Sequence, residues 1–276
     1  MFQIQSKEFL ADNIFKMIVK APRIAKKHEA GHFVIIKLDK SGERVPLTIA
    51  ESDPEKGTIT LVVQRVGVTS HKLSLLNEGD EIMDIVGPLG HPTHIENFGT
   101  VLCAGGGVGI APLLPIVKAL KKAGNRIVTV LAARSKDLII LEDQMKEHSD
   151  ELIVMTDDGS YGEKGLVTNG MEQFIQTEKP DQSVVIGPAV MMKFASQLTQ
   201  KYNIPTIASL NTIMVDGTGM CGACRVSING KTKFVCVDGP EFPADQIDFD
   251  EMLTRLGAYK EEEKKAYDEY LQEMEK

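Results

Sequence analysis

The sequence predicts an antiparallel β-barrel followed by a doubly wound parallel α/β domain and a small cysteine-bearing domain. Short runs rich in Val and Ile, bounded by turn signals, fill the first part of the chain. Apolar strands then alternate with helical patterns. Three of the four cysteines cluster near the end. We therefore expect domains at residues 1–97, 98–206 and 207–243, and a helical tail at 244–276.

Composition narrows the class of protein. The 276 residues carry a formal net charge of −8, which argues against nucleic acid as the main partner because phosphate binding needs a basic surface. The longest apolar run, 101–120, is interrupted by glycines and prolines, so no membrane span is expected. The N-terminus carries charges where a signal peptide has an apolar core. We expect a cytoplasmic protein whose cysteines are thiols or metal ligands.

The first domain is expected to be the barrel. The segments 32–38, 58–66 and 80–88 have the composition of strands, and turn signals such as Asp53-Pro54 separate them. One short helical stretch falls near residues 71–76. Several short strands at this spacing are typical of an antiparallel barrel.

The second domain begins near Phe98. Its elements are strands that alternate with helices, which predicts a parallel sheet with helices on both faces. The expected strands are 100–106, 127–134, 151–159 and 182–189, and the clearest helices are 107–124 and 141–148.

The cysteine cluster follows the spacing of a plant-type [2Fe–2S] site, with an aspartate in the first ligand position. The expected ligands are Asp216, Cys221, Cys224 and Cys236. Nearby glycines let the loop wrap tightly and turn backbone N–H groups toward cluster sulfides. A hairpin over 224–236 would return Cys236 to the loop. A zinc site or unliganded thiols are the alternatives. Cys103 is expected to be a small buried apolar residue.

Two glycine turns predict a nicotinamide nucleotide site. The first lies between a strand and a helix, where backbone amides and the helix dipole favour a pyrophosphate. Its residues are Gly105, Gly106, Gly107, Val108, Gly109 and Pro112. The second turn, Gly187-Pro188 with Met191 after it, follows another apolar strand and would let a flat ring lie against the backbone.

The barrel offers a candidate flavin site. A short strand segment, Val45, Pro46, Leu47 and Thr48, presents a hydroxyl and an apolar wall to an isoalloxazine ring, with Thr48 near the redox-active nitrogen. Val63, Gln64 and Arg65 follow on another strand. Thr69 and Ser70, at a helix start, would hold the flavin pyrophosphate. Each feature taken singly also fits an ordinary strand or helix cap.

The choice between nicotinamides is predicted from the strand ends. Arg134 ends the second strand, where it could contact a phosphate. The third strand ends in Asp157 and Asp158, which would repel a 2′-phosphate and accept ribose hydroxyls. We expect a preference for NADH over NADPH.

Together, the barrel, the glycine turn and the Gly-Pro-x-x-Met stretch resemble the ferredoxin–NADP reductase superfamily over residues 1–205. Adding the cluster segment, the chain resembles electron-transfer subunits that carry FAD and one [2Fe–2S] cluster. Two families share this plan: the electron-transfer subunit of dihydroorotate dehydrogenase B, and the small subunit of NADH-dependent reduced ferredoxin:NADP oxidoreductase, also described as sulfide dehydrogenase subunit beta. The single Asp among the ligands, the stretch 237–252 and the long tail favour the second.

The resemblance implies an oxidoreductase that passes electrons between NAD(H), FAD and the [2Fe–2S] cluster within an electron-bifurcating enzyme. It further implies a heterodimer with a larger flavin and iron–sulfur subunit, through which ferredoxin is reached. No catalytic acid or base is expected. The superfamily's Arg-x-Tyr-Ser/Thr flavin motif is altered, with Arg44 one place early, and its Cys-Gly-Pro is Ile186-Gly187-Pro188. The tail is either a solvated helix or a contact surface for the partner. A metal-binding module without enzymatic activity is the other class.

Overall fold

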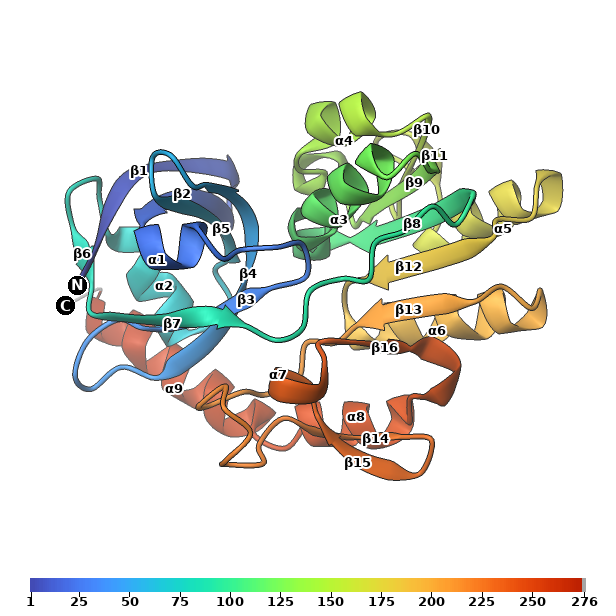
Figure 1. Cartoon of the computed structure of the whole chain (residues 1–276). Helices are drawn as coiled ribbons and strands as arrows, with labels where there is room; N and C mark the ends of the chain where they lie inside the picture. Colours follow the sequence, from blue (N-terminus) through green and yellow to red (C-terminus); the bar gives the residue numbers. More distant parts are fainter. Residues whose placement is uncertain (275–276) are drawn as a thin grey trace.

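The computed structural model describes residues 1–274 and arranges them as two large lobes with a smaller C-terminal segment beneath (Figure 1). The sequence prediction of a helical tail at 244–276 includes residues 275–276, which lie outside the described residues. Within 1–274, no helix is both long and apolar enough to cross a membrane.

The first lobe is one antiparallel sheet that curls into a nearly closed barrel, which confirms the predicted fold class. Its strands are ordered β6-β1-β2-β5-β4-β3-β7, so the two end strands follow one another in sequence. The strands are β1 (Phe2–Ala11), β2 (Ile14–Lys20), β3 (Phe33–Lys37), β4 (Arg44–Asp53), β5 (Thr58–Gln64), β6 (Glu81–Ile82) and β7 (Asp84–Leu89). Helices α1 (Pro22–Ala25) and α2 (Val68–Leu75) cover its openings.

The barrel closes around side chains from alternating strand positions. Along β2, Phe15, Met17 and Val19 are fully buried, as the two-residue repeat of a half-buried strand requires. They form one apolar cluster with Ile59 and Leu61 of β5. Burial of each of these apolar side chains stabilises the lobe by about 1.5–3 kcal/mol.

The second lobe is a sheet ordered β11-β10-β9-β8-β12-β13-β16, parallel throughout except for the pairing of β13 with β16. This arrangement confirms the predicted doubly wound domain. The strands are β8 (Thr100–Gly106), β9 (Arg126–Ala133), β10 (Glu151–Thr156), β11 (Glu163–Lys164), β12 (Gln182–Ile186), β13 (Thr206–Ser209) and β16 (Glu241–Pro243).

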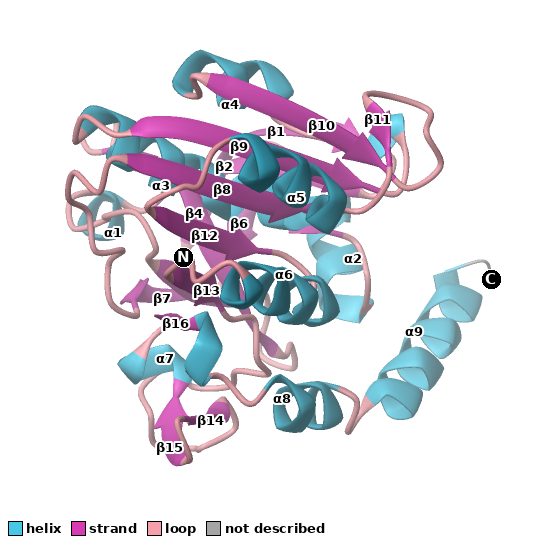
Figure 2. Ribbon diagram, turned by 90° about the vertical axis from the view of Figure 1, so that its right-hand side faces the viewer, coloured by secondary structure: helices cyan, strands magenta, loops and turns pink. Residues whose placement is uncertain are grey.

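Helices cover both faces of this sheet. The turn η1 (Gly107–Gly109) leads into α3 (Ile110–Lys122), which packs with α4 (Glu142–His148) on one face. Figure 2 shows α5 (Val167–Thr177) and α6 (Ala189–Lys201) on the other face. The short turn η2 (Lys136–Leu138) follows β9. Lys118 of α3 pairs with Glu51 of β4 and thereby joins the two lobes.

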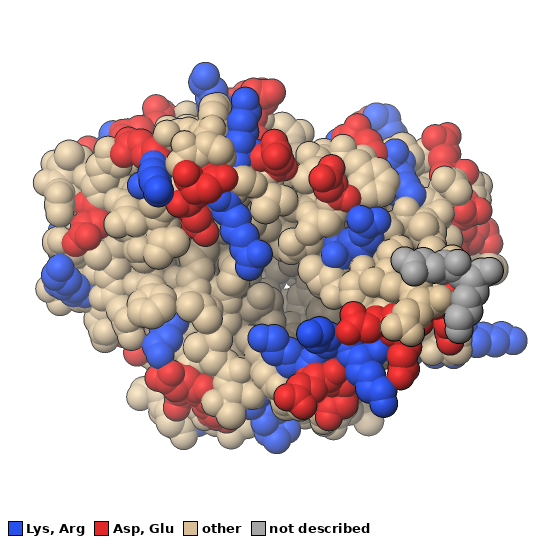
Figure 3. All heavy atoms as spheres, turned by 180° about the vertical axis from the view of Figure 1, so that it is seen from behind, with Lys and Arg blue, Asp and Glu red and all other residues tan. Residues whose placement is uncertain are grey.

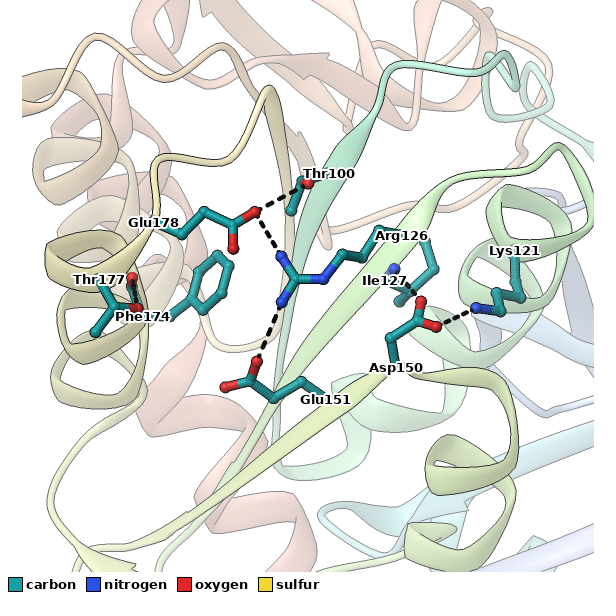
Figure 4. A network of polar contacts seen from close by, with 9 residues as sticks. All are labelled: Thr100, Lys121, Arg126, Ile127, Asp150, Glu151, Phe174, Thr177 and Glu178. Carbon is teal, nitrogen blue, oxygen red and sulfur yellow. Dashed lines mark hydrogen bonds and ion pairs between the residues drawn. The ribbon is translucent and has the colours of Figure 1, made fainter.

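Surface ion pairs join the starts of neighbouring strands to the ends of helices. Arg126 at the start of β9 lies between Glu178, which follows α5, and Glu151 of β10 (Figure 4). Lys121 and the backbone N–H of Ile127 both contact Asp150. These side chains are about two-fifths exposed, so each pair is worth only about 0.2–1 kcal/mol.

The C-terminal segment packs against the second lobe and adds one strand, β16, to its sheet. It contains β14 (Arg225–Ile228), β15 (Lys231–Phe234), α7 (Val235–Asp238), η3 (Ala244–Gln246), α8 (Phe249–Leu256) and α9 (Lys260–Met274). The predicted hairpin over 224–236 is present as β14 and β15. The sheet of the second lobe, however, extends to Ser209 in β13 and then takes in β16. The expected boundary at 206 therefore falls inside β13, and the expected segment 207–243 includes β16, which belongs to the sheet of the second lobe.

Candidate functional site

The strand order reverses between β8 and β12, so the crevice of a doubly wound sheet opens there. The glycine turn after β8 and the Gly187-Pro188 turn after β12 flank this point. The structure therefore brings together the two turns that the sequence separates by some 80 residues. This edge of the sheet faces the barrel (Figure 1).

The two turns touch so closely that side chains are excluded. A Cβ on Gly109 would lie 2.7 Å from the carbonyl oxygen of Ile186 and 2.8 Å from Cα of Gly187. Gly107 has φ of +56°, which a residue with a side chain rarely adopts. Backbone N–H groups at the start of α3 thus remain open to a pyrophosphate, and the residues fit a dinucleotide.

Met191 fills the space beside both turns. A Cβ on Gly106 would lie 2.3 Å from its sulfur, and one on Gly187 would lie 2.6 Å from its Cε. The thioether therefore supplies an apolar wall next to the proposed nicotinamide position. Ile186, where the superfamily has a cysteine, is buried at the end of β12.

Arg134, Asp157 and Asp158 lie side by side where β9 and β10 end. The backbone N–H of Asp158 donates to the carbonyl of Arg134 at 3.2 Å, and all three side chains are exposed. Ser160 was missed by the sequence reasoning, and it donates to the Asp158 carboxylate through its N–H and its hydroxyl, which lowers the pKa of Asp158. An Asp-x-Ser turn is a local pattern that would have indicated this contact.

The first half of β4 offers an open strand edge. Arg44–Thr48 pairs with β3, whereas pairing of β4 with β5 begins only at Ile49. Val45–Thr48 is half-buried, so the barrel parts here and leaves backbone groups along one edge free of the ladder. The residues fit a flat ring with hydrogen-bonding edges. Nη1 of Arg44 lies 3.9 Å from Oδ2 of Asp84, at the start of β7.

The other predicted flavin residues are placed differently. Val63 lies within the barrel core, so only its backbone could contact a ligand. Gln64 and Arg65 are half-buried beyond it. The hydroxyl of Ser70 accepts from the N–H groups of Val66 and Gly67, and that of Thr69 donates to Glu43.

These hydroxyls therefore hold the start of α2. The ligand-binding capacity of this turn rests on its backbone. The first N–H groups of a helix have no partner within that helix, so those of α2 could donate to a pyrophosphate.

Two of the four predicted cluster ligands meet in the structure. The sulfurs of Cys224 and Cys236 lie 3.2 Å apart, beyond the ~2.05 Å of a disulfide. Burial and the neighbouring Cys224 thiol raise the pKa of Cys236 to about 12. The backbone N–H of Cys236 donates to the Cys224 sulfur at 3.5 Å. An amide directed at a cysteine sulfur is the donor arrangement that an iron–sulfur cluster uses.

In the same loop, Asp216 is half-buried and Cys221 is exposed. The Asp216 carboxylate accepts from the N–H groups of Thr218 and Cys221 at 2.8 and 2.9 Å, and these bonds lower the pKa of Asp216. Over residues 1–274, the structure brings no three metal-coordinating side chains into one closed set. The ligand set stays a prediction, and its donor chemistry fits a cluster. Cys103 is buried in β8, as expected.

Two family models match the chain. The iron–sulfur cluster binding domain of dihydroorotate dehydrogenase B matches residues 211–248, and the oxidoreductase NAD-binding domain matches residues 104–197.

A Thermotoga maritima protein described as an electron transfer subunit homolog of dihydroorotate dehydrogenase B (NAD(+)) is 52% identical, over 98% of this chain and 95% of its own. A probable electron transfer subunit of the same enzyme from Methanocaldococcus jannaschii is 39% identical, over 72% and 74%.

Solved structures agree with these relatives. One comes from a study of flavin-based electron bifurcation in an NADH-dependent reduced ferredoxin-NADP oxidoreductase; it is 50% identical with a TM-score of 0.93 over 98% of both chains. A cytochrome P450 reductase from Amycolatopsis, 18% identical with a TM-score of 0.62 over 72% of this chain and 65% of its own, shares the fold alone.

The fold and its nucleotide crevice define an oxidoreductase of the ferredoxin–NADP reductase superfamily. Within that class, the chain belongs to the family of electron-transfer subunits that carry FAD and an iron–sulfur cluster.

Proposed function

We propose that this chain is the small subunit of an NADH-dependent reduced ferredoxin:NADP oxidoreductase. The observation that carries the proposal is the agreement in fold over 98% of the chain, cluster segment included, with the bifurcating oxidoreductase. The placement of the three candidate sites supports it. This one protein has a candidate site for each redox group. They are the open edge of β4 for the flavin, the crevice between β8 and β12 for the nicotinamide nucleotide, and the cysteine loop for the cluster.

Each site has a defined task in this proposal. The turns at Gly109 and Gly187 hold the nicotinamide nucleotide, and Met191 excludes water beside it. The edge of Val45–Thr48 orients the flavin ring, with the Thr48 hydroxyl as a donor. When bound, FAD exchanges electron pairs with a nicotinamide and single electrons with an iron–sulfur cluster. Asp216, Cys221, Cys224 and Cys236 hold the cluster.

A larger flavin and iron–sulfur subunit is the proposed partner, and ferredoxin is reached through it. The cysteine loop supports this because apolar side chains surround its exposed part. Met220 is 88% exposed and Val215 and Val237 are about two-fifths to one-half exposed. Exposed apolar side chains around a redox site are typical of a protein contact. We place the complex in the cytoplasm on the basis of its free cysteines.

Dihydroorotate dehydrogenase B is the second candidate, because the relatives and the matching cluster domain are named for it. The two are separated by co-purifying the chain with its natural partner under anaerobic conditions. We expect FAD and iron to co-elute, and NADH together with reduced ferredoxin to reduce NADP⁺. Orotate formation from dihydroorotate, without that activity, would favour the second candidate. A colourless zinc protein would contradict both.

A further inference from the structure

The C-terminal helix α9 is polar on most of its surface but has one apolar stripe. Tyr267, Tyr270 and Leu271 are its half-buried aromatic and aliphatic side chains, at spacings of three and four residues. Residues at these spacings share one face of a helix. The other positions of α9 are mostly charged and exposed. A helix of this kind owes its placement to what the stripe touches.

The stripe touches α2 of the barrel. The Tyr267 hydroxyl and Nδ1 of His71 form a 3.0 Å hydrogen bond. The Tyr267 and Tyr270 rings meet the His71 ring at 64° and 75°, with centroids 5.7 and 5.4 Å away. Nζ of Lys72 lies 5.7 Å from the centroid of the Tyr270 ring. Edge-to-face and cation–π contacts of this geometry are attractive.

His71 links the contacts of α9 to the first turn of α2. Its backbone N–H donates to the carbonyl of Gly67 at 2.9 Å and so closes the first turn of α2. That turn carries the N–H groups proposed above to bind the flavin pyrophosphate. Its imidazole is 9% exposed, and burial together with the charge of Arg65 lowers the pKa of His71. The neutral ring packs between the two tyrosines without a buried charge.

The opposite end of the same segment is anchored at the cysteine loop. Helix α8 directly precedes α9 and packs beside α6 and β14. Nη2 of Arg255 in α8 donates to the carbonyl of Ala223 at 3.2 Å, and Ala223 lies between two predicted cluster ligands. Figure 2 shows α9 leaving α8, and Figure 1 shows it running from there to the barrel.

We propose that α9 is a strap that fastens the flavin-binding turn of α2 to the cluster segment, with Tyr267 and His71 as positioning residues for FAD. This inference rests on the proposed function. It explains why a charged helix reaches from the last domain to the first. The strap would keep the flavin in place in a chain whose two redox centres lie in different lobes.

The test is the rate of FAD release from the full chain with its cluster, followed by flavin fluorescence after dilution. Y267F removes the hydroxyl and keeps the ring. Loss of one hydrogen bond, worth about 1 kcal/mol, predicts about fivefold faster release. Y259F is the matched control, because Tyr259 lies in the turn before α9, is 59% exposed and has no side-chain hydrogen bond in the described residues. Its release rate is expected to equal that of the wild type.

Amide exchange of residues 68–75 is the second measurement. Y267F should speed exchange there, and Y259F should not. Equal FAD release from Y267F and the wild type would overturn the proposal even if exchange changed. Equal acceleration in both variants would also overturn it. If the wild-type chain takes up no FAD, the proposed function fails instead, and the exchange measurement then reports whether Tyr267 holds α2.

Discussion

Gly109 lies where two loops leave no room for a side chain. The atoms nearest to its absent Cβ belong to the backbone of Ile186 and Gly187, which cannot move aside as a side-chain end can. We expect Gly109→Ala to destabilise the fold by about 1–3 kcal/mol and to raise the KM for NADH. Thermal unfolding and dye-reduction kinetics measure both effects. Gly257→Ala, where contacts begin at 3.5 Å, should leave both unchanged.

We expect His28 to make the stability of the barrel depend on pH. Burial, then the neighbouring His32, lowers the pKa of His28 to about 4, and its Nε2 has no hydrogen-bond partner in the described residues. The unfolded chain binds this proton near pH 6.5, so stability is lost as the pH falls from 6.5 toward 4. We expect a loss of roughly 2 kcal/mol between pH 7.5 and 5. Denaturant titrations should show a shallower pH dependence in His28→Gln; equal slopes would contradict the assignment.

Asp216 is assigned as a cluster ligand only by its spacing from the cysteines, because the structure does not bring it together with Cys224 and Cys236. We expect Asp216→Cys to keep the [2Fe–2S] cluster but to alter its EPR spectrum and make its potential more negative, because a thiolate donates more charge to iron than a carboxylate. Potentiometry with EPR detection measures both. Thr218→Cys adds a thiol to the same loop outside the ligand positions and should change neither. An unchanged potential in Asp216→Cys would refute the ligand role.

At the scale of elements, we expect the ends of β9 and β10 to determine the choice between NADH and NADPH. Asp157 and Asp158 are exposed beside Arg134 and would repel a 2′-phosphate. We expect kcat/KM to favour NADH, and D157N/D158N to narrow the NADH-over-NADPH ratio about fivefold, the effect of about 1 kcal/mol of screened repulsion. Asp143→Asn/Glu147→Gln, at two exposed positions of α4, is the charge-matched control. A wild-type preference for NADPH would contradict this prediction.

Strand β16 adds an antiparallel edge strand to the second sheet, which the periodicity of the sequence did not indicate. Three residues, 241–243, pair antiparallel with β13 and return the chain to the second lobe after the cysteine loop. Such a short strand has too few residues for a two-residue repeat to be recognised. Glu241 gains a half-buried position from it, and desolvation raises the pKa of its carboxyl to about 7.

At the scale of the whole molecule, the cluster segment has no core of its own. Cys224, Val226 and Cys236 belong to one buried cluster with Phe33 of the barrel and Met171 of α5. From behind, residues of both charges lie on each lobe, and the surface is hollowed between the lobes (Figure 3).

This shared core carries a prediction about folding. A fragment of residues 207–243 should remain unfolded and form no [2Fe–2S] absorbance when supplied with iron and sulfide, because most of its apolar contacts lie outside it. The full chain treated identically should form the cluster. Circular dichroism and visible absorbance measure the outcome, and a folded, coloured fragment would show that residues 207–243 are an independent domain.

The sequence by itself determined the classes of element and the chemistry. Strand and helix periodicities, the glycine turns and the cysteine spacing are local signals, each carried by fewer than about 20 neighbouring residues. They predicted the barrel, the doubly wound sheet, the β14–β15 hairpin and the family.

Only the tertiary structure decided which distant residues meet. The contact of Gly109 with Gly187, the pairing of β16 with β13 and the hydrogen bond of Tyr267 with His71 join positions far apart in the chain. Such contacts depend on the path of the whole backbone and on the close packing of its core, which local periodicity does not encode.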